Sequence, residues 1–182
     1  MKSNTGEGRQ ALQQARLLGV AGKVDEAIAA YEKLFGGVPD DVDAAIEYWT
    51  LVARLPARHS EGVSQLKKLN ASAPGNVSLL TALAKQMFAD NKPQEGFAYL
   101  AEMARSASGR GIAADMWYSE VKSMPVSKAS VQALQQFLLQ FPTGSVAANA
   151  RVLLDQQQAQ LQDPTFRARS EGLAAVKSGN TS

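Results

Sequence analysis

Side chains that could perform catalysis are few and widely spaced in this 182-residue chain. His59 is its only histidine and it has no cysteine, which argues against a serine-histidine-aspartate triad and against a structural zinc site. Glu47 and Asp115 offer two carboxylates, as a glycosidase requires, but the repeat register places them two repeats apart. Gly109 and Gly111 lack the lysine-serine ending of a phosphate-binding loop. The sequence therefore predicts no enzyme, no cofactor and no metal site, with His59 as a solvated turn residue.

Two tryptophan–tyrosine pairs could instead contact carbohydrate. Trp49 and Trp117 lie 68 residues apart, with Tyr48 and Tyr118 beside them. Exposed aromatic faces would offer a platform on which a glucan chain can stack. At equivalent places in repeated helices, however, we expect both tryptophans to pack in the core. The tyrosines are left open, because a phenol can keep its hydroxyl in water while its ring is buried.

Composition narrows the classes of protein. Hydrophobic residues make up 45% and charged residues 20% of the chain, which is ordinary for a soluble domain. The net charge of +2 is too balanced to predict nucleic-acid binding. No apolar run approaches the ~18 residues of a membrane span. Residues 1–8 contain no apolar signal segment, so we expect either a cytosolic protein or one whose signal is missing from this sequence.

Residues 22–40 are the unit around which the chain is organised. Gly22 suits a sharp turn between antiparallel helices. Asp25 and the glutamate after it follow in the first helical turn, where carboxylates stabilise the positive end of the helix dipole. Gly36 and Pro39 end the helix. One apolar face at helical spacing is formed by Ala27, Ile28, Tyr31, Leu34 and Phe35.

The same signals recur along the chain. Pro39, Pro74 and Pro142 are separated by 35 and then by 68 residues. Pairs of a glutamate and a small residue keep the same phase at Glu26-Ala27, Glu61-Gly62 and Glu95-Gly96. A period of about 34 residues is typical of tetratricopeptide (TPR) helix hairpins, which bury their apolar faces by stacking. We therefore predict an all-α TPR solenoid, with a disordered tail at 1–8 and four TPR-like hairpins at 9–40, 41–75, 76–108 and 111–142.

Two segments depart from this repeat. Residues 106–111 read Ser-Ala-Ser-Gly-Arg-Gly, a flexible linker composition. The candidate hinge residues there are Ser108, Gly109 and Gly111. Residues 145–178 predict two non-TPR helices or the start of the next repeat, with Asp163 as the N-cap of the second and a proline after it in the first turn. Because terminal repeats normally carry a polar cap, we expect the chain to be a fragment of a longer solenoid.

The first helices of stacked hairpins line the concave face of a solenoid. In this register the residues directed toward that groove are Arg16, Glu47, Arg54, Lys85, Phe88, Asp115, Ser119 and Lys122. The four cations would form a broken basic track. We predict either a docking groove for a polar or acidic partner segment or an ordinary charged surface, and the sequence leaves both open.

Several strings that hairpin packing does not require carry a narrower resemblance. They are Glu47-Tyr48-Trp49, Leu55-Pro56-Ala57-Arg58, Trp117-Tyr118, Met124-Pro125-Val126-Ser127 and Asp163-Pro164-Thr165-Phe166-Arg167-Ala168-Arg169. With them, the chain resembles the N-terminal periplasmic region of the C subunit of bacterial cellulose synthase, a family of outer-membrane cellulose export proteins. In that family the repeats lead to an outer-membrane β-barrel.

The resemblance implies a non-catalytic periplasmic scaffold that joins the inner-membrane synthase to the export pore. Its partners would be proteins of the cellulose synthase complex, with glucan or peptidoglycan as further possibilities and no nucleic acid. Two alternatives remain open from the sequence. One is a generic TPR adaptor for peptides, and the other is an α-solenoid carbohydrate-active enzyme such as a wall-cleaving lyase.

Overall fold

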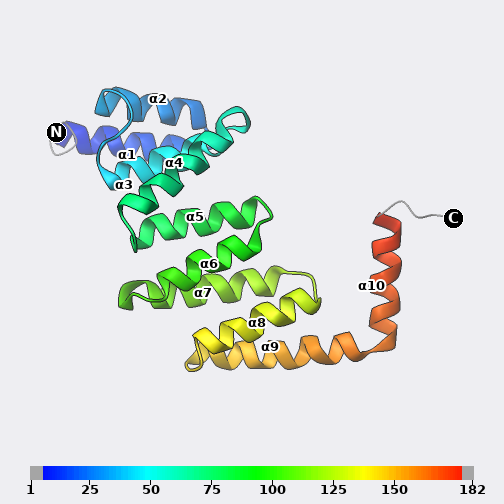
Figure 1. Ribbon diagram of the computed structural model, residues 1–182. Coiled ribbons are helices and arrows are strands. Elements are labelled where there is room, and N and C mark those ends of the chain that lie inside the picture. The colour runs from blue at the N-terminus through cyan, green and yellow to red at the C-terminus, as the bar shows by residue number, and fades with distance from the viewer. Residues whose placement is uncertain (1–5, 178–182) are drawn as a thin grey trace. The chain divides into compact units, whose positions relative to one another are not determined.

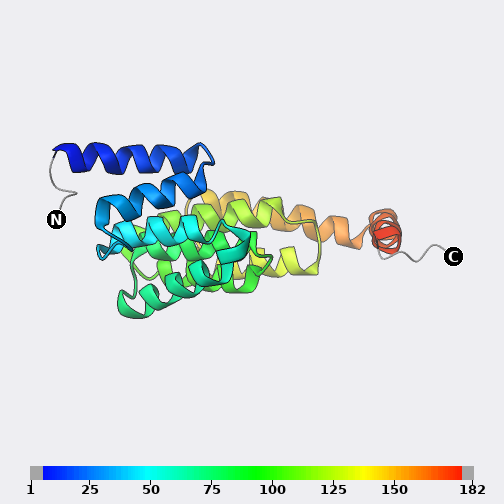
Figure 2. The same cartoon turned by 90° about the horizontal axis from the view of Figure 1, so that it is seen from above.

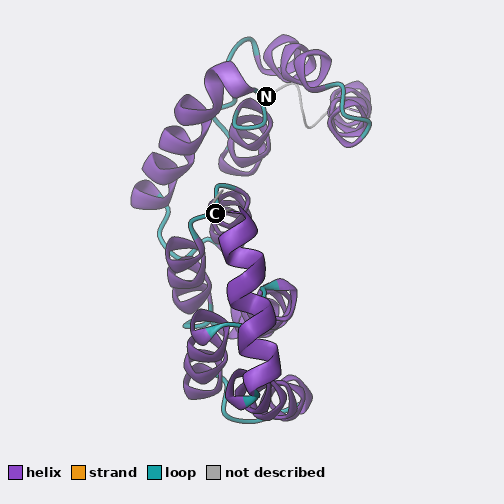
Figure 3. Cartoon of the chain, turned by 90° about the vertical axis from the view of Figure 1, so that its right-hand side faces the viewer, coloured by secondary structure: helices purple, strands orange, loops and turns teal. Residues whose placement is uncertain are grey.

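The computed structural model describes residues 6–177, and this range is helical throughout apart from turns (Figure 3). The chain divides into two compact units between Met103 and Ala104. The first unit contains α1 (Gly6–Val20), α2 (Val24–Phe35), α3 (Val42–Val52), a 3₁₀ turn (Pro56–Arg58), α4 (His59–Ser72), α5 (Val77–Ala89) and α6 (Pro93–Met103) (Figure 1). The second contains α7 (Ala107–Ser123), α8 (Lys128–Gln140), α9 (Ser145–Gln162) and α10 (Pro164–Lys177). The predicted all-α fold is confirmed.

Local signals in the sequence explain most helix ends. Asp25 and Glu26 occupy the first turn of α2, and Gly36 ends that helix in the left-handed conformation at φ 78°. The amide of Gly36 donates to the carbonyl oxygen of Glu32, which satisfies one of the orphan carbonyls. At the start of α3, the Asp41 side chain accepts a hydrogen bond from the amide of Ala44, as expected of an N-cap.

In the first unit, helices pair as antiparallel hairpins around a continuous buried cluster. Leu66, Leu79 and Leu83 are fully buried, and Tyr31 and Tyr48 are 1% exposed. Small residues let the second helix of a hairpin approach the first closely. A Cβ added to Gly62 of α4 would lie 2.5 Å from the backbone nitrogen of Ala53. One added to Gly96 of α6 would lie 2.7 Å from the ring of Phe88.

In the second unit, α7, α8 and α9 pack around their own core. Trp117 is 6% exposed and lies against Phe137 and Phe141, with ring centroids 6.5 and 6.1 Å away. The Ser130 hydroxyl donates to Gln157 Oε1 at 2.7 Å, and both side chains are buried. The hydrogen bond satisfies the buried donor and acceptor, so the contact between α8 and α9 can bury this polar pair without leaving either group unpaired.

The last two helices do not form an antiparallel hairpin. Figure 1 shows α10 running across the end of α9, and in Figure 2 α10 is seen along its axis while α9 is seen from the side. Asp163 between them is extended, with φ −71° and ψ 119°. Its side chain accepts from the amide of Thr165 at 2.8 Å, so it caps the start of α10 as the sequence predicts. This geometry agrees with a helix pair that departs from the repeat.

The flexible linker expected at residues 106–111 is wrong, because the structure places Ser106 at the N-cap of α7 and residues 107–111 in its first turns. The candidate hinge residues Ser108, Gly109 and Gly111 are therefore helical. The Ser106 hydroxyl accepts from the Gly109 amide at 3.0 Å and starts the helix. The guanidinium of Arg110 donates to the carbonyl oxygen of Gln140 at 2.8 Å and lies over the ring of Phe141. These contacts fix a segment whose composition alone favours flexibility.

At the N-terminus, α1 begins at Gly6, three residues before the predicted start of the first hairpin. The part of the predicted tail at residues 6–8 is therefore helical, and residues 1–5 lie outside the described range. The predicted end of the last segment at residue 178 also lies outside it. The other predicted hairpin boundaries lie between helices in the structure, at Asp40, Asn76 and Pro142.

Candidate partner-binding site

Three helices of the first unit and the turn after α3 bring one carboxylate and two guanidinium groups to a shared cleft. Glu47 of α3 accepts two hydrogen bonds from Arg16 of α1, from Nε to Oε2 at 2.8 Å and from Nη2 to Oε1 at 2.7 Å. The hydroxyl of Tyr31 on α2 also donates to Glu47 Oε2. This bidentate geometry is the strong form of an arginine–carboxylate pair. It ties together the first three helices.

The contacts within this network and the burial of its phenol shift the pKa values of Tyr31 and Arg16. Burial raises the pKa of Tyr31, and the hydrogen bond to the Glu47 carboxylate raises it further. The hydrogen bond from Arg16 to Glu47 raises the pKa of that guanidinium. The Arg16 side chain is 51% exposed and the Glu47 side chain 33% exposed. The phenol of Tyr31 therefore stays protonated and the guanidinium of Arg16 stays charged throughout the physiological pH range.

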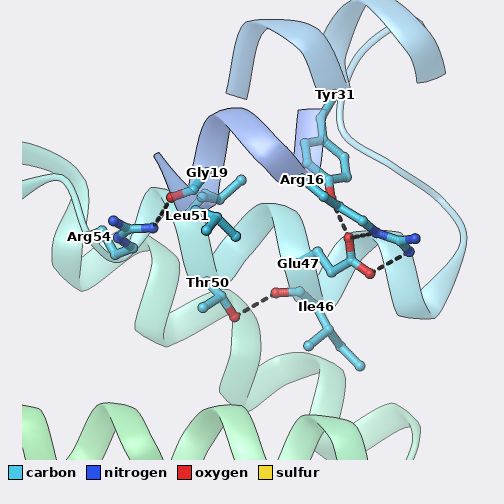
Figure 4. A pocket seen from close by; sticks show the side chains of 9 residues that line it. Arg16, Gly19, Tyr31, Ile46, Glu47, Thr50, Leu51 and Arg54 are labelled. Carbon is cyan, nitrogen blue, oxygen red and sulfur yellow. Dashed lines mark hydrogen bonds and ion pairs between the residues drawn. The ribbon is translucent and has the colours of Figure 1, made fainter. Parts of the chain in front are cut away.

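Arg54 lies at the opposite end of the cleft. Its Nη1 donates to the carbonyl oxygen of Gly19 at 2.8 Å (Figure 4). Gly19 belongs to the last turn of α1, which contains no basic residue of its own. Arg54 therefore supplies a cation at the negative end of that helix dipole. A Cβ on Gly19 would lie 3.0 Å from Leu51, so the glycine also lets α1 approach α3.

Between the two arginines the cleft has a volume of about 460 Å³. Its residues come from α1, α2, α3 and the turn after α3: Arg16, Gly19, Val20, Tyr31, Ile46, Glu47, Thr50, Leu51 and Arg54 (Figure 4). The volume falls within the ~300–1,000 Å³ typical of ligand sites. Aliphatic walls with charged groups at both ends suit a ligand that has an apolar part and a polar part.

The structure thus brings together three of the eight predicted groove residues, Arg16, Glu47 and Arg54. Lys85 is exposed on α5, while the half-buried ring of Phe88 packs against Phe97 of its own hairpin, with centroids 5.0 Å apart. The other three lie on α7 in the second unit, and all are exposed: Asp115, Ser119 and Lys122. The continuous groove through all eight residues stays a prediction.

The expectation that the tryptophans are core residues is confirmed. Trp49 is 8% exposed and Trp117 6% exposed, and the Trp117 indole donates to the carbonyl oxygen of Ala133 at 3.2 Å. The Tyr48 ring is buried too, and its hydroxyl donates to Glu32 Oε1 at 2.7 Å. These rings leave no open face on which a sugar could stack.

His59 is not the solvated turn residue that the sequence predicts. It begins α4, and its Nδ1 lies 2.6 Å from the carbonyl oxygen of Ala53 while its Nε2 lies 3.0 Å from Asp90 Oδ2. The ring therefore connects the α3–α4 turn to the end of α5. The backbone hydrogen bond to Ala53 raises the pKa of His59, and the carboxylate of Asp90 adds to this effect. Asp90 is 31 residues away in sequence, so spacing alone could not reveal the contact.

Sequence reasoning also missed Tyr31 and Gly19 as parts of the cleft. Tyr31 was expected only as one residue of an apolar face, because nothing in its spacing shows that its hydroxyl meets Glu47. Among the residues that the structure describes, no cluster of three or more histidine, aspartate or glutamate side chains could hold a metal ion. In the same range, no helix combines the length and apolarity needed to cross a bilayer.

Comparison with known proteins identifies the family. No family model matches the chain. A crystal structure of the flexible tandem repeat domain of the C subunit of bacterial cellulose synthase superposes with a TM-score of 0.70 and 51% identity. The match covers 90% of this chain and 67% of that one. The chain belongs to the family of tandem repeat domains of the bacterial cellulose synthase C subunit.

Curated relatives agree with this family. The chain is 52% identical to the cellulose synthase operon protein C of Salmonella typhimurium and 51% identical to that of Escherichia coli. Each match covers 98% of this chain. The chain spans only 15% and 16% of the length of these two relatives. The similarity therefore concerns one part of a much longer type of protein.

Proposed function

We propose that the chain is a non-catalytic scaffold segment of the bacterial cellulose synthesis and export machinery. In this proposal it lies in the periplasm and links the inner-membrane synthase to the outer-membrane export pore through protein contacts. The observation that carries the proposal is the agreement in sequence and fold with a tandem repeat domain of the cellulose synthase C subunit over 90% of the chain. Helix hairpins that stack along a chain present extended surfaces, which suits a role in joining other components.

The state of Glu47 argues against the enzyme alternative. A glycosidase needs one carboxylic acid that can donate a proton and a second carboxylate that is free to act as base or nucleophile. Both oxygens of Glu47 instead accept hydrogen bonds from Arg16, and one accepts from Tyr31 as well. These contacts hold the carboxylate against Arg16 and Tyr31, so Glu47 is not free to act as the base or nucleophile of a glycosidase. Turnover of cellulose or peptidoglycan by the chain, abolished by Glu47→Gln, would overturn this argument.

The experiment for the scaffold proposal uses the full-length protein in cellulose-producing cells. One strain lacks the segment that corresponds to residues 6–177. A second strain carries an unrelated helical repeat of equal length in its place. We expect both to lose cellulose secretion, because the surface contacts of this segment are absent. Full secretion with the unrelated repeat would reduce the segment to a passive spacer and contradict the proposal. Fractionation of a tagged full-length protein tests the periplasmic location separately.

A generic peptide adaptor is the second candidate, favoured by the cleft between Arg16 and Arg54. It predicts that the chain binds peptide segments with no relation to cellulose synthesis. The replacement strains distinguish the two candidates, since an adaptor of unrelated function would leave cellulose secretion intact. Titration with cello-oligosaccharides, followed by tryptophan fluorescence, tests direct glucan contact. Because Trp49 and Trp117 are buried, we expect no spectral shift.

A further inference from the structure

The cleft of the first unit differs in its hydrogen-bonding capacity from an ordinary charged surface. Its main acceptors are already engaged: Glu47 accepts from Arg16 and Tyr31, and the carbonyl oxygens of Gly19 and Ile46 accept from Arg54 and Thr50. The available groups are donors. Arg54 Nε and Nη2 and Arg16 Nη1 have no hydrogen-bond partner within residues 6–177. Two arginines against one glutamate also leave the cleft with a net charge of +1.

Aliphatic surface lies directly between these donors. Ile46 and Leu51 line the cleft, and Val20 at its rim is 86% exposed. Leu17, one helical turn before Val20 on α1, is 62% exposed. Leu17 and Val20 thus place exposed aliphatic surface on the face of α1 beside the cleft. A ligand that covers Val20 would gain apolar burial in addition to its contacts with the guanidinium groups.

The aromatic content of the cleft separates the possible ligand classes. Among the described residues that line this cleft, Tyr31 is the only aromatic one. It is 1% exposed, and its hydroxyl donates to Glu47. A glucan would therefore find no ring on which to stack and few acceptors for its many hydroxyl donors. A polypeptide segment can present both an aliphatic side chain and a carboxylate at short spacing. Arginine is well suited to such a carboxylate, because its planar donors match the two oxygens.

We propose that this cleft binds a segment of a partner protein in which an aliphatic residue lies next to an aspartate or glutamate. The aliphatic side chain contacts Val20, Ile46 and Leu51, and the carboxylate binds the free donors of Arg54. At the other end of the cleft, Glu47 already occupies the position beside Arg16, so a second carboxylate of the partner segment cannot bind there. This inference rests on the proposed scaffold function and specifies the chemistry of one contact.

The test probes the labelled chain against an array of random-sequence peptides. Wild type should select aspartate or glutamate beside leucine, isoleucine or valine. Arg54→Gln should lose the acidic preference, and Val20→Ser should lose the aliphatic preference. The matched controls are Lys68→Gln, an exposed cation on α4 that does not line the cleft, and Val38→Ser, an aliphatic residue that is 52% exposed outside the cleft. Both controls should keep the wild-type profile. Melting curves show whether each variant is folded. If Arg54→Gln does not fold, Val20→Ser still tests the proposal.

Fluorescence anisotropy with the best peptide gives the size of the effect. Exchange of its acidic residue for the amide, or Arg54→Gln in the protein, should weaken binding by roughly tenfold, because a charge-assisted hydrogen bond is lost. Binding should also weaken with added salt. The proposal is overturned if the array shows no acidic preference, if wild type and Arg54→Gln give the same profile, or if sedimentation shows that the cleft is covered by a second copy of the chain. If no peptide is selected on the array but cellulose secretion is lost in the replacement strains, the proposed peptide contact is wrong and the scaffold function is still supported.

Discussion

The second and third hairpins place a glycine at the same point of the repeat but oppose it with different parts of the neighbouring helix. Gly62 of α4 faces the backbone nitrogen, Cα and Cβ of Ala53, at 2.5–2.8 Å from an added Cβ. Gly96 of α6 faces the outer ring atoms of Phe88, at 2.7–2.9 Å. A backbone cannot move without its helix, whereas a half-buried ring can turn about its own bonds. The same sequence signal therefore has a different physical meaning in the two hairpins.

His59 further restrains the second hairpin relative to the third. Its ring contacts the carbonyl oxygen of Ala53, the residue whose nitrogen and Cα face Gly62. The other ring nitrogen contacts Asp90 at the end of α5. Ala53 is thus held from two sides, by the close approach of α4 and by the imidazole. We infer that the second hairpin is the rigid one and that the third can adjust its packing.

The largest expected effect comes from Gly62→Ala. Since the new methyl group must displace the Ala53 backbone, we expect a loss of about 3 kcal/mol of unfolding free energy, at the upper end of overpacking costs. Urea unfolding followed by Trp49 fluorescence in a Trp117→Phe background reports on the first unit alone. A loss below about 1 kcal/mol would show that α4 can move away from α3 and would remove the contrast between the hairpins.

Gly96→Ala should change the same free energy by no more than about 1 kcal/mol. The Phe88 ring can turn aside, and alanine gains about 1 kcal/mol over glycine in a helix interior. The measurement is the same urea titration, with Phe88→Leu combined with Gly96→Ala as a check. If Gly96→Ala were as damaging as Gly62→Ala, and the double variant did not relieve it, the ring would be as immobile as a backbone.

Gly111→Ala is the matched control for a helical glycine in open space. An added Cβ there meets no atom within 4 Å. We expect a gain of roughly 0.5–1 kcal/mol in the stability of the second unit, from helix propensity and a less flexible unfolded chain. Trp117 fluorescence in a Trp49→Phe background reports it. A loss of stability would favour a non-helical segment at this position, as the composition of residues 106–111 suggested.

The smallest effect concerns pH and His59. A raised pKa in the folded protein means that the contribution of His59 is complete below the ordinary histidine value of 6.5. It is lost as the pH rises through the higher folded value. Both ring nitrogens face oxygen acceptors, so only the protonated ring can donate to both. Since the side chain is 36% exposed, we expect less than about 1 kcal/mol.

Melting temperatures between about pH 5 and 9 should fall more steeply for wild type than for His59→Asn. The asparagine keeps a donor for Ala53 and loses the Asp90 contact. Lys92 lies near enough to oppose protonation of the ring, so Lys92→Gln should extend the stable range to higher pH. Equal pH profiles for wild type and His59→Asn would show that the imidazole contributes nothing to the tie between the hairpins.

The parts of the fold that could be predicted from the sequence are those set by local chemistry. Helix ends at Gly36, Asp41 and Asp163 follow from turn geometry and side-chain caps, which act within a few residues. The helical period also placed Trp49 and Trp117 in the core. The α7 start could not be predicted, because the bonds of Arg110 to Gln140 and Phe141 offset the flexibility of two glycines and link residues 30 positions apart.

For the candidate site, the repeat register placed Arg16, Glu47 and Arg54 on one face, and the structure brings them to one cleft. The register could not show that Arg16 and Glu47 pair with each other. Nor could it show that Tyr31 completes the pair, since a tyrosine on an apolar face is ordinarily a packing residue. Whether Glu47 is paired and Arg54 has free donors depends on distances of a few ångströms between side-chain atoms. The spacing of residues in the sequence does not specify such distances.

The most direct measurement of the whole account is photo-crosslinking in cellulose-producing cells. A photoreactive amino acid replaces Val20 in the full-length protein, with Val38 as the control position. We predict a crosslink from position 20 to a protein of the cellulose synthase machinery, lost when Arg54→Gln is added and absent from position 38. Crosslinks to glucan, or equal crosslinks from both positions, would contradict the account.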